Sequence, residues 1–328
     1  MNSLYPLKFK PIYKDYIWGG SKLKDKFNKK IPSSFDRCAE SWEISSIQDN
    51  ISVVSNGFLA GNNLQELVEI YMGDLVGDKV YSKFGDEFPI LVKLIDATDT
   101  LSIQVHPNND VAKKKHHAFG KTEMWYVIDS DPNSKIITGF NRKITKAEYQ
   151  EHLMNNKLQD ILNVEQANKD DVFFLPSGRI HAIGKGILLA EIQQSSDITY
   201  RIFDWNRVDK EGNHRELHTD LALDVIDFKK YDSYKFTKPI TKNESSELIH
   251  CEFFDVNRLS FNQSIERDYH LLDSFVIYLC VEGGLNIISG ENTVESLTKG
   301  ETVLIPAELN EITLKPLPSA TILEVFIK

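Results

Sequence analysis

The stretch LSIQVHPNND, residues 101–110, alternates apolar and polar side chains until a proline and a polar turn end it. Alternate side chains of a β-strand point to opposite faces, so this pattern predicts a strand with one polar face. The apolar face carries Leu101, Ile103 and Val105, and the polar face carries Ser102, Gln104 and His106. Two arrangements explain the polar face: an edge strand with one side in water, or a strand lining a metal or substrate site in a barrel.

Length and composition indicate an ordinary globular protein. The chain has 328 residues, enough for roughly two domains of about 150 residues each. Hydrophobic residues make up 41% and charged residues 26%. The three cysteines are scattered and form neither a disulfide framework nor a CxxC metal pair. We therefore expect a cytoplasmic, reducing environment.

Charge and hydropathy exclude two classes of partner. The net charge is −10 and no basic block is present, which argues against nucleic acid. No run approaches the roughly 20 apolar residues that a membrane helix needs, and lysines and prolines interrupt the N-terminal 20 residues where a secretory signal would lie. An anionic small molecule stays compatible with the chain, provided that a local basic cluster receives it.

Most of the chain predicts short strands bounded by Gly, Pro, Asn and Asp. Helical spacing is expected near 62–80 and 145–163, where Asn63 with Glu66 and Thr145 with Glu148 form candidate capping boxes. A third helix is expected near 219–228. The pattern indicates a mainly β protein with small helical insertions.

A weak internal repeat links residues 170–183 (DDVFFLPSGRIHAI) with residues 299–314 (KGETVLIPAELNEITL). Each copy has an acidic or glycine lead-in, an apolar strand, a proline and a polar turn, as in a jelly-roll barrel. The first copy carries His181, whereas the second has Asn310 and Glu311. We therefore expect two β-barrels: residues 1–235 with a metal, and residues 236–328 without one, joined by a linker near 229–248. Chance similarity between two strands that end in proline is the alternative.

Three more side chains turn His106 into a candidate metal site. In KTEMWYVID, alternation places Lys121, Glu123 and Trp125 on one face. If this strand pairs with 101–106, Glu123 lies beside Gln104 and His106, and His181 follows a Pro-Ser-Gly turn at the barrel mouth. Two imidazoles, one carboxylate and one amide oxygen suit Zn²⁺ and, less selectively, Mn²⁺, Fe²⁺ or Ni²⁺. The absence of a thiolate from this set favours an open, catalytic site.

Other charged or basic residues near these motifs allow two interpretations each. His116 and His117 are competing candidates for metal ligands, but they lie in a lysine-rich stretch that we expect to be a loop facing solvent. Arg201 shares a strand face with Thr199 and Phe203, so it is either a structural residue or a fixed positive charge near the metal. Lys93 interrupts the apolar strand ILVKLID and is either an edge gatekeeper or a site residue.

Longer motifs resemble one known family. They are YIWGGSKL (16–23), AESWEIS (39–45), LVKLIDATDTLSIQVHP (91–107), GKTEMWYVID (120–129), LPSGRIHAIGKGILLAEIQQSSDITYRIFDW (175–205) and RELHTDLALDVIDF (215–228). The chain resembles the type I mannose-6-phosphate isomerases, or phosphomannose isomerases, in their short bacterial form within the cupin superfamily. The resemblance covers the first two thirds, and the last third matches only as a degenerate barrel.

This resemblance implies a double cupin-type β-barrel and one zinc ion per chain. The aligned ligands are Gln104, His106, Glu123 and His181. The family's essential arginine aligns with Arg201, and its substrate-pocket serine and lysine align with Ser102 and Lys121. The helical parts are shorter here than in the long fungal-type enzymes, so no phosphate contacts are carried over from them. The partner implied is a small sugar phosphate, and we expect a monomer or a weak homo-oligomer.

The implied reaction is the reversible interconversion of mannose 6-phosphate and fructose 6-phosphate through a cis-enediol. A metal acting as Lewis acid and a guanidinium would stabilise the enediolate charge. Lys121, a metal-bound water and a pocket histidine all stay open as the proton carrier. Two alternatives also stay open: a metal cupin of other chemistry, such as an oxygenase with two histidines and one carboxylate, and a non-catalytic sugar-phosphate-binding cupin.

Overall fold

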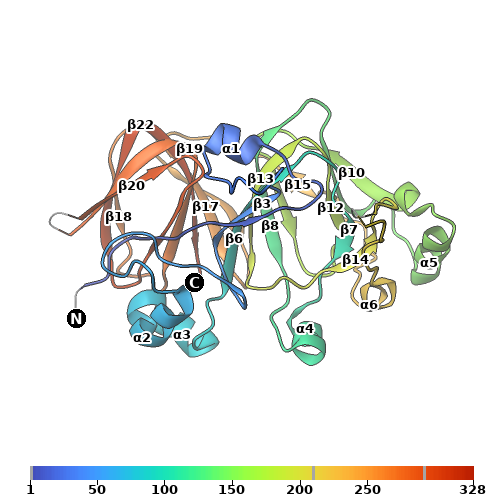
Figure 1. The fold of residues 1–328 in the computed structure, drawn as a ribbon, viewed down its shortest axis with the longest axis horizontal. Helices are drawn as coiled ribbons and strands as arrows, with labels where there is room; N and C mark the ends of the chain where they lie inside the picture. Colours follow the sequence, from blue (N-terminus) through green and yellow to red (C-terminus); the bar gives the residue numbers. More distant parts are fainter. Residues whose placement is uncertain (1–2, 209–210, 291–292) are drawn as a thin grey trace.

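Three antiparallel sheets of five, seven and eight strands build the fold (Figure 1). The computed structural model describes residues 3–208, 211–290 and 293–328. The five-stranded sheet has the order β10 (Leu162–Gln166), β9 (Lys135–Phe140), β12 (His181–Ile183), β7 (Ile103–Val105) and β14 (Tyr200–Phe203). The seven-stranded sheet has the order β15 (Lys235–Phe236), β11 (Val172–Leu175), β8 (Glu123–Ser130), β13 (Ile187–Gln194), β6 (Ile90–Ala97), β3 (Glu40–Ile44) and β2 (Ile12–Lys14).

The eight-stranded sheet contains the C-terminal strands and one strand from the N-terminus. Its order is β1 (Leu7–Lys8), β21 (Thr302–Ile305), β19 (Val276–Ser289), β22 (Glu311–Phe326), β17 (Asp255–Phe261) and β16 (Ser245–His250), with β18 (Ile265–Asp268) on β22 and β20 (Thr293–Thr298) on β19. A small hairpin pairs β4 (Ser46–Ile47) with β5 (Asn50–Ile51). The predicted division after residue 235 stays a prediction, although β1 shows that the N-terminus contributes to both parts.

Short helices join the strands. They are α1 (Lys22–Phe27), α2 (Leu64–Val76), α3 (Asp78–Phe84), α4 (Asn109–His116), α5 (Lys146–Met154), the 3₁₀ turn η1 (Leu158–Ile161) and α6 (Thr219–Leu223). Both predicted capping boxes form, at the start of α2 and of α5, with the side-chain and backbone bonds in each direction. The helix expected near 219–228 ends early, at Leu223.

The stretch 107–120 contains helix α4, so the prediction of a loop there was wrong. The Asn108 side chain accepts a hydrogen bond from the backbone N–H of Val111 and thereby caps the helix. Ala112 is the helix's one buried side chain, and three lysines and His116 fill its C-terminal half. Without an apolar stripe, the sequence lacked the periodic signal that identifies a helix. The expectation that His116 and His117 are exposed is confirmed.

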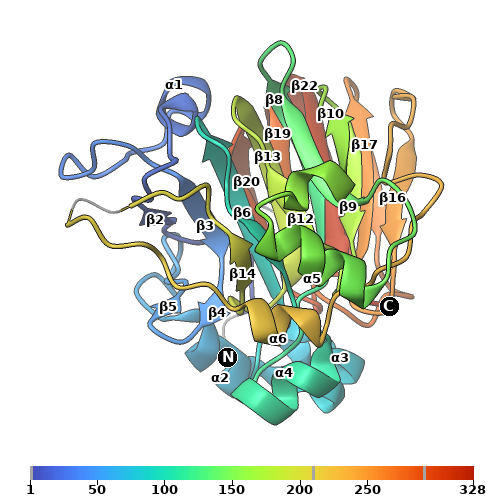
Figure 2. The ribbon, with the colours of Figure 1, turned by 90° about the vertical axis from the view of Figure 1, so that its right-hand side faces the viewer.

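Alternation along the strands sorts side chains into separate cores. On β8, Met124 and Tyr126 pack into a core shared with strands of the eight-stranded sheet, whereas Trp125 faces the five-stranded sheet. On β7, Ile103 and Val105 pack against the layer of α5 and α6, which covers the five-stranded sheet (Figure 2). The expected position of Leu101 beside them was wrong. Because β7 begins at Ile103, the alternation does not yet apply at Leu101, which joins the inner core with Trp125.

The two copies of the repeat share the order of their elements, but the strands of the first copy belong to two sheets and those of the second copy to one sheet. In each, a strand leads to a proline and a turn, and a second strand follows: β11 to β12 in the first copy, β21 to β22 in the second. His181 begins β12 and Glu311 begins β22. The mainly β, cupin-type architecture is as predicted. None of the helices in the described ranges is long and apolar enough to span a bilayer.

Candidate active site

Two facing sheets bring the candidate site residues together. In the five-stranded sheet, Gln104 on β7 lies opposite His181 on one side and Arg201 on the other. Residues opposite each other on neighbouring strands share a face, so this row points into the space between the sheets. Glu123 enters the same space from β8 of the seven-stranded sheet. The expected pairing of the Glu123 strand with residues 101–106 was therefore wrong, because the two strands face each other across the site.

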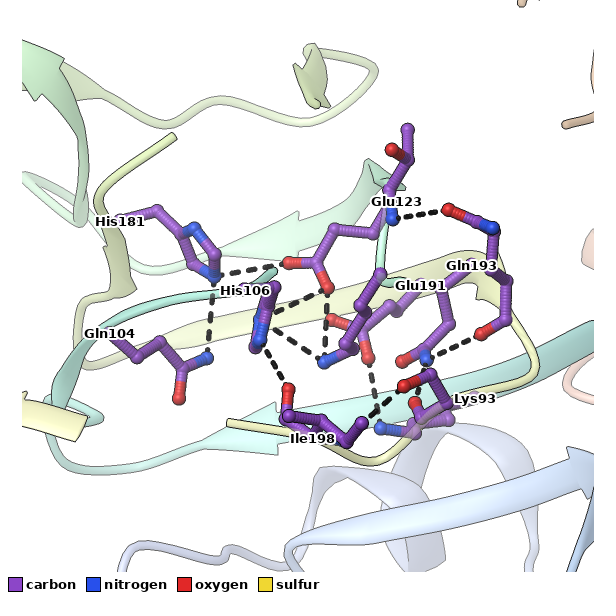
Figure 3. Close-up of polar contacts among 12 residues, drawn as sticks. Lys93, Gln104, His106, Glu123, His181, Glu191, Gln193 and Ile198 are labelled. Atoms are coloured by element: carbon purple, nitrogen blue, oxygen red, sulfur yellow. Dashed lines mark hydrogen bonds and ion pairs between the residues drawn. The ribbon is translucent and has the colours of Figure 1, made fainter. Parts of the chain in front are cut away.

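His106, Glu123 and His181 form a buried cluster whose ligand atoms all lie within 4.8 Å of one another (Figure 3). His181 Nε2 is 3.2 Å from Glu123 Oε1, and His106 Nε2 is 3.5 Å from Glu123 Oε2. Metal ligands of this kind normally have the other ring nitrogen fixed by a hydrogen bond, which sets the tautomer. The next contacts show that this holds here.

Backbone carbonyls orient both imidazole rings. His106 Nδ1 donates to the carbonyl of Ile198 at 2.7 Å, and His181 Nδ1 donates to the carbonyl of Arg179 at 2.8 Å. A carbonyl oxygen can only accept, so both Nδ1 atoms carry the hydrogen. In the neutral rings, each Nε2 therefore presents a lone pair to the Glu123 carboxylate, which also has only lone pairs to offer.

The electrostatics of the cluster favour the protonation states in which His106 and Glu123 can bind a metal. Burial, followed by the Lys121 ammonium, holds the pKa of His106 well below its usual range, so the ring is neutral. Burial acts to raise the pKa of Glu123, but the opposing charges, led by the Lys121 ammonium, outweigh it and hold that pKa well below its usual range. The cluster thus contains an ionised carboxylate beside the neutral His106 ring.

The donor set fits a divalent cation. Lys121 Nζ is 3.1 Å from Glu123 Oε2, yet neither carboxylate oxygen accepts a hydrogen bond from any residue that the structure describes. Buried polar atoms without partners are rare in folded proteins, and an ion is one of the standard explanations. An ion among the three groups would be coordinated by two nitrogens and one oxygen, which suits a first-row divalent metal.

Gln104 lies beside this cluster with its amide nitrogen toward His181. Its Nε2 is 3.4 Å from His181 Nε2. Metal ligation needs the amide oxygen instead, which a half-turn of the terminal amide would bring to the same place. Gln104 thus borders the site as expected, and its role as a ligand stays a prediction.

The opposite wall carries a polar row that the sequence only partly revealed. Trp125, Glu191, Lys93 and Trp42 lie opposite one another across β8, β13, β6 and β3. Glu191 accepts a hydrogen bond from Trp125 Nε1 at 2.7 Å and pairs with Lys93 at 3.1 Å. Because β6 is an inner strand, the edge-gatekeeper interpretation of Lys93 was wrong. Burial acts to lower the pKa of Lys93, but Glu191 and Glu40 outweigh it and raise that pKa.

A cavity of about 450 Å³ lies between the two rows. Its wall includes Ser102, Gln104, Lys121, Lys93 and Arg201. Lys121 and Gln104 also contact the metal-ligand cluster, so they connect the cavity with it. The cavity therefore brings together four predicted site residues, Ser102, Gln104, Lys121 and Arg201, with Lys93, for which a site role was one of two interpretations.

The segment 216–218 fixes the strand that carries Arg201. Arg201 Nη1 donates to the carbonyl of Glu216 at 2.9 Å, and the Arg201 backbone N–H donates to His218 Nδ1 at 3.3 Å. In return, the His218 N–H donates to the Arg201 carbonyl at 2.7 Å. Burial, then the nearby Arg215, lowers the pKa of Arg201, although an arginine keeps its charge at any working pH.

Several cavity residues were missed at the sequence level. Glu191, Arg215 and His218 line the cavity but were not singled out. A carboxylate in the apolar strand ILLAEIQQ was a usable signal for Glu191, of the same kind that marked Lys93. Arg215 and His218 follow a loop and gave no periodic signal. His116, the competing ligand candidate, lies elsewhere and contacts the Tyr200 hydroxyl at 2.7 Å.

Comparison with known proteins decides the family. Residues 6–143 match the family described as phosphomannose isomerase type I, catalytic domain, and residues 244–322 match the mannose-6-phosphate isomerase cupin domain. Mannose-6-phosphate isomerase ManA of Bacillus subtilis is 38% identical over 318 residues, which cover 94% of this chain and 96% of the relative. The chain belongs to the type I phosphomannose isomerase family.

A further relative and a solved structure agree with this family. The mannose-6-phosphate isomerase of Streptococcus mutans is 34% identical over 297 residues, which cover 88% of this chain and 89% of that relative. The crystal structure of the mannose 6-phosphate isomerase from Bacillus subtilis superposes with a TM-score of 0.86 at 31% identity, covering 98% of this chain and 99% of that one. The family resemblance seen in the sequence motifs and the cupin fold are both confirmed.

Proposed function

We propose that the chain interconverts mannose 6-phosphate and fructose 6-phosphate with one zinc ion held by His106, Glu123 and His181, and by Gln104 once its amide is reversed. One observation carries the proposal. Two imidazoles and one carboxylate converge in the buried interior, with Nε2 of each ring turned toward the Glu123 carboxylate, next to a cavity of about 450 Å³.

The donor set and its surroundings favour a catalytic rather than a structural ion. Nitrogen and oxygen donors without a thiolate suit zinc, and a site with fewer than four firm protein ligands keeps a position open. When bound, such an ion supplies a Lewis acid that polarises a carbonyl or hydroxyl oxygen of the sugar. Lys121 and Gln104 lie between the ligand cluster and the cavity.

The chain's own charges address the difficult part of the reaction. Removing the proton from C2 of the open-chain aldose leaves negative charge on an enediolate oxygen. Arg201 brings a fixed guanidinium to the cavity wall, held through Nη1 by the Glu216 carbonyl. A cation that is already oriented stabilises the developing charge without reorganising at the moment of reaction.

Lys121 and Ser102 are placed to orient the sugar. Both side chains are buried and line the cavity, and the Lys121 ammonium stands 3.3 Å from His106 Nε2. They would hydrogen-bond sugar oxygens and hold C1 and C2 close to the ligand cluster, where few water molecules compete.

An acidic chain needs a local basic cluster to bind a sugar phosphate, and the cavity provides one. The net charge is −10, yet Lys93, Lys121, Arg201 and Arg215 all line the cavity. Lys93 and Lys121 are paired with Glu191 and Glu123. Arg201 donates to a neutral carbonyl, and Arg215 shares the Asp204 carboxylate with Arg207, so these two arginines are the cations offered to an anionic group.

A coupled assay tests the proposal directly. Purified protein is incubated with mannose 6-phosphate, and fructose 6-phosphate is followed through a coupling enzyme. We expect turnover that a chelator abolishes and Zn²⁺ restores, equally in air and under argon. No turnover in the zinc-loaded protein would refute the isomerase, and a strict requirement for oxygen would identify a metal oxygenase instead.

We also propose that the enzyme works in the cytoplasm as a monomer or weak homo-oligomer. The cysteines Cys38, Cys251 and Cys280 are all free thiols, which a reducing compartment preserves. The ligand cluster and the cavity are built from residues of one chain.

A further inference from the structure

The cavity has a buried end and an open end. Lys93, Lys121 and Ser102 are buried, and Lys121 contacts the metal-ligand cluster. At the other end, the Tyr16 residue is 40% exposed, and the side chains of Arg215 and His218 are 32% and 25% exposed. A ligand in this cavity therefore places one end near the ligand cluster and the other near solvent.

Arg215 is held at the open end by a shared carboxylate. Arg215 donates to Asp204 from Nε at 2.7 Å and from Nη2 at 2.5 Å. Asp204 also accepts a hydrogen bond from Arg207 Nη2 at 2.5 Å. Burial acts to raise the pKa of Asp204, but the two arginines outweigh it and lower that pKa, so the carboxylate is ionised.

Three arginines gather at this end of the cavity. Two guanidinium groups share the Asp204 carboxylate, and Arg201 stands nearby with a neutral carbonyl as its hydrogen-bond partner. Other carboxylates lie around them: Asp99 is 3.6 Å from Arg207, Glu216 is 3.7 Å from His218, and Asp197 is an exposed residue of the cavity wall. An anionic group that enters the cavity here meets the guanidinium groups of Arg201 and Arg215.

Arg215 and Arg207 differ in what they can reach. Arg207 uses Nη1 on the Thr100 carbonyl at 2.7 Å and is not part of the cavity wall. Arg215 lines the cavity, and its Nη1 donates no hydrogen bond to any residue within the described ranges. Asp204 thus binds Nε and Nη2 of Arg215, and Nη1 is left to donate to a ligand.

The shape of the substrate decides which group arrives there. The reaction takes place at C1 and C2, and the phosphate is on C6, at the opposite end of the carbon chain. If the reacting carbons lie at the ligand cluster, the phosphate lies toward the open end.

We propose that Arg215, oriented by Asp204, recognises the phosphate group and makes the enzyme selective for phosphorylated over free sugars. This inference rests on the proposed function. It assigns Arg215 to ground-state binding, in contrast to Arg201, whose charge is needed during the chemical step. Lys cannot replace the arginine fully, because it cannot bind Asp204 through a planar fork and a phosphate at the same time.

Kinetics of three variants test the assignment. We expect Arg215→Gln to raise KM for mannose 6-phosphate and Ki for inorganic phosphate by roughly 10- to 100-fold, the value of one charge-assisted contact, with kcat nearly unchanged. Arg215→Lys should give a smaller increase. The kcat/KM for unphosphorylated mannose should not change, because that sugar never uses the contact.

Arg207→Gln is the matched control, since it removes the other arginine from Asp204 without touching the cavity. Equal losses in Arg215→Gln and Arg207→Gln, or an equal loss for mannose and mannose 6-phosphate, would show a structural role and overturn the proposal. Unchanged KM and Ki in Arg215→Gln would overturn it as well. Thermal unfolding of each variant verifies that it is folded.

Calorimetric binding separates this proposal from the proposed function. If wild-type protein binds mannose 6-phosphate and inorganic phosphate and Arg215→Gln does not, the subsite stands even when no isomerisation is found. If the wild type turns over mannose 6-phosphate and Arg215→Gln binds it equally well, the isomerase stands and the subsite is wrong.

Discussion

Two buried carboxylates, Glu123 in the first half of the molecule and Glu324 in the second, have different partners. Glu123 in the first half faces two imidazole lone pairs and the Lys121 ammonium, next to an open cavity. Glu324 in the second half has no accessible surface and pairs with Arg267 at 2.6 Å. On the proposed function, Glu123 binds a metal ion that comes from solution, whereas the cation that pairs with Glu324 is part of the chain.

The Glu324–Arg267 pair in the second half is surrounded by further hydrogen bonds. Glu324 also accepts hydrogen bonds from the Tyr269 hydroxyl at 2.6 Å and from Asn257 Nδ2 at 2.9 Å. Burial acts to lower the pKa of Arg267, but Glu324 outweighs it and raises that pKa. Both oxygens of Glu324 are engaged and its cation is built in, so this site is suited to support rather than to metal binding.

Asp96 shows what happens to a buried carboxylate that receives no paired cation. Its Oδ2 accepts the Lys22 N–H at 2.6 Å, while Oδ1 lacks a partner among the described residues. Burial raises the pKa of Asp96 to about 6. On the proposed function, the three buried carboxylates have three different partners: a metal ion, an internal salt bridge and a proton.

The largest effect is expected from removing a ligand of the first site. His181→Ala should lose the metal and reduce activity by on the order of 10³-fold or more, because several kcal/mol of charge stabilisation disappear with the ion. Elemental analysis and the coupled assay measure both. Glu311→Ala, which changes the first residue of the corresponding strand in the second repeat copy, should alter neither, and full metal occupancy in His181→Ala would break the comparison.

Next in size is the loss of the internal salt bridge. Glu324→Gln leaves Arg267 buried without its counter-charge and should lower the free energy of unfolding by about 3–5 kcal/mol. Urea unfolding measures this. The double change Glu324→Gln with Arg267→Met should cost less, and metal content should stay at one ion per folded chain. A second tightly bound zinc ion in the wild type would contradict the division of roles.

A change at Arg201 tests whether the cavity beside Glu123 stabilises the charge that develops during the reaction. Arg201→Lys should lower kcat by about 10²–10³-fold, comparable to the loss of one preorganised donor, and leave metal content unchanged. The loss should fall on kcat because the charge that it stabilises develops only in the transition state. A rise in KM with kcat preserved would make Arg201 a ground-state phosphate contact instead.

Asp96 should give the smallest effect, visible as a pH dependence. Its pKa of about 6 in the folded state lies above its ordinary value of 3.8, so the folded state holds the proton more tightly. The associated stability is complete below pH 4 and is lost as the pH rises to about 6, by at most about 3 kcal/mol. Asp96→Asn should remove this slope from unfolding curves recorded between pH 4.5 and 7.5. An identical slope in both proteins would show that Asp96 is ionised throughout.

The sequence by itself determined the local elements and most of the chemistry. Alternation placed Gln104 and His106 on one polar face and Lys121, Glu123 and Trp125 on another, because the strand period depends only on backbone geometry. Capping boxes located the starts of α2 and α5 for the same local reason. The missing histidine in the second repeat copy predicted which half would lack a metal.

Only the tertiary structure decided which faces meet. Glu123 reaches His106 across two sheets rather than along one ladder, and Lys93 lies on an inner strand instead of an edge. Arg215 enters the cavity from a loop whose position depends on Asp204. Pairing between distant strands and the placement of loops follow from burial and hydrogen bonding of the whole chain, so short-range sequence patterns do not contain them.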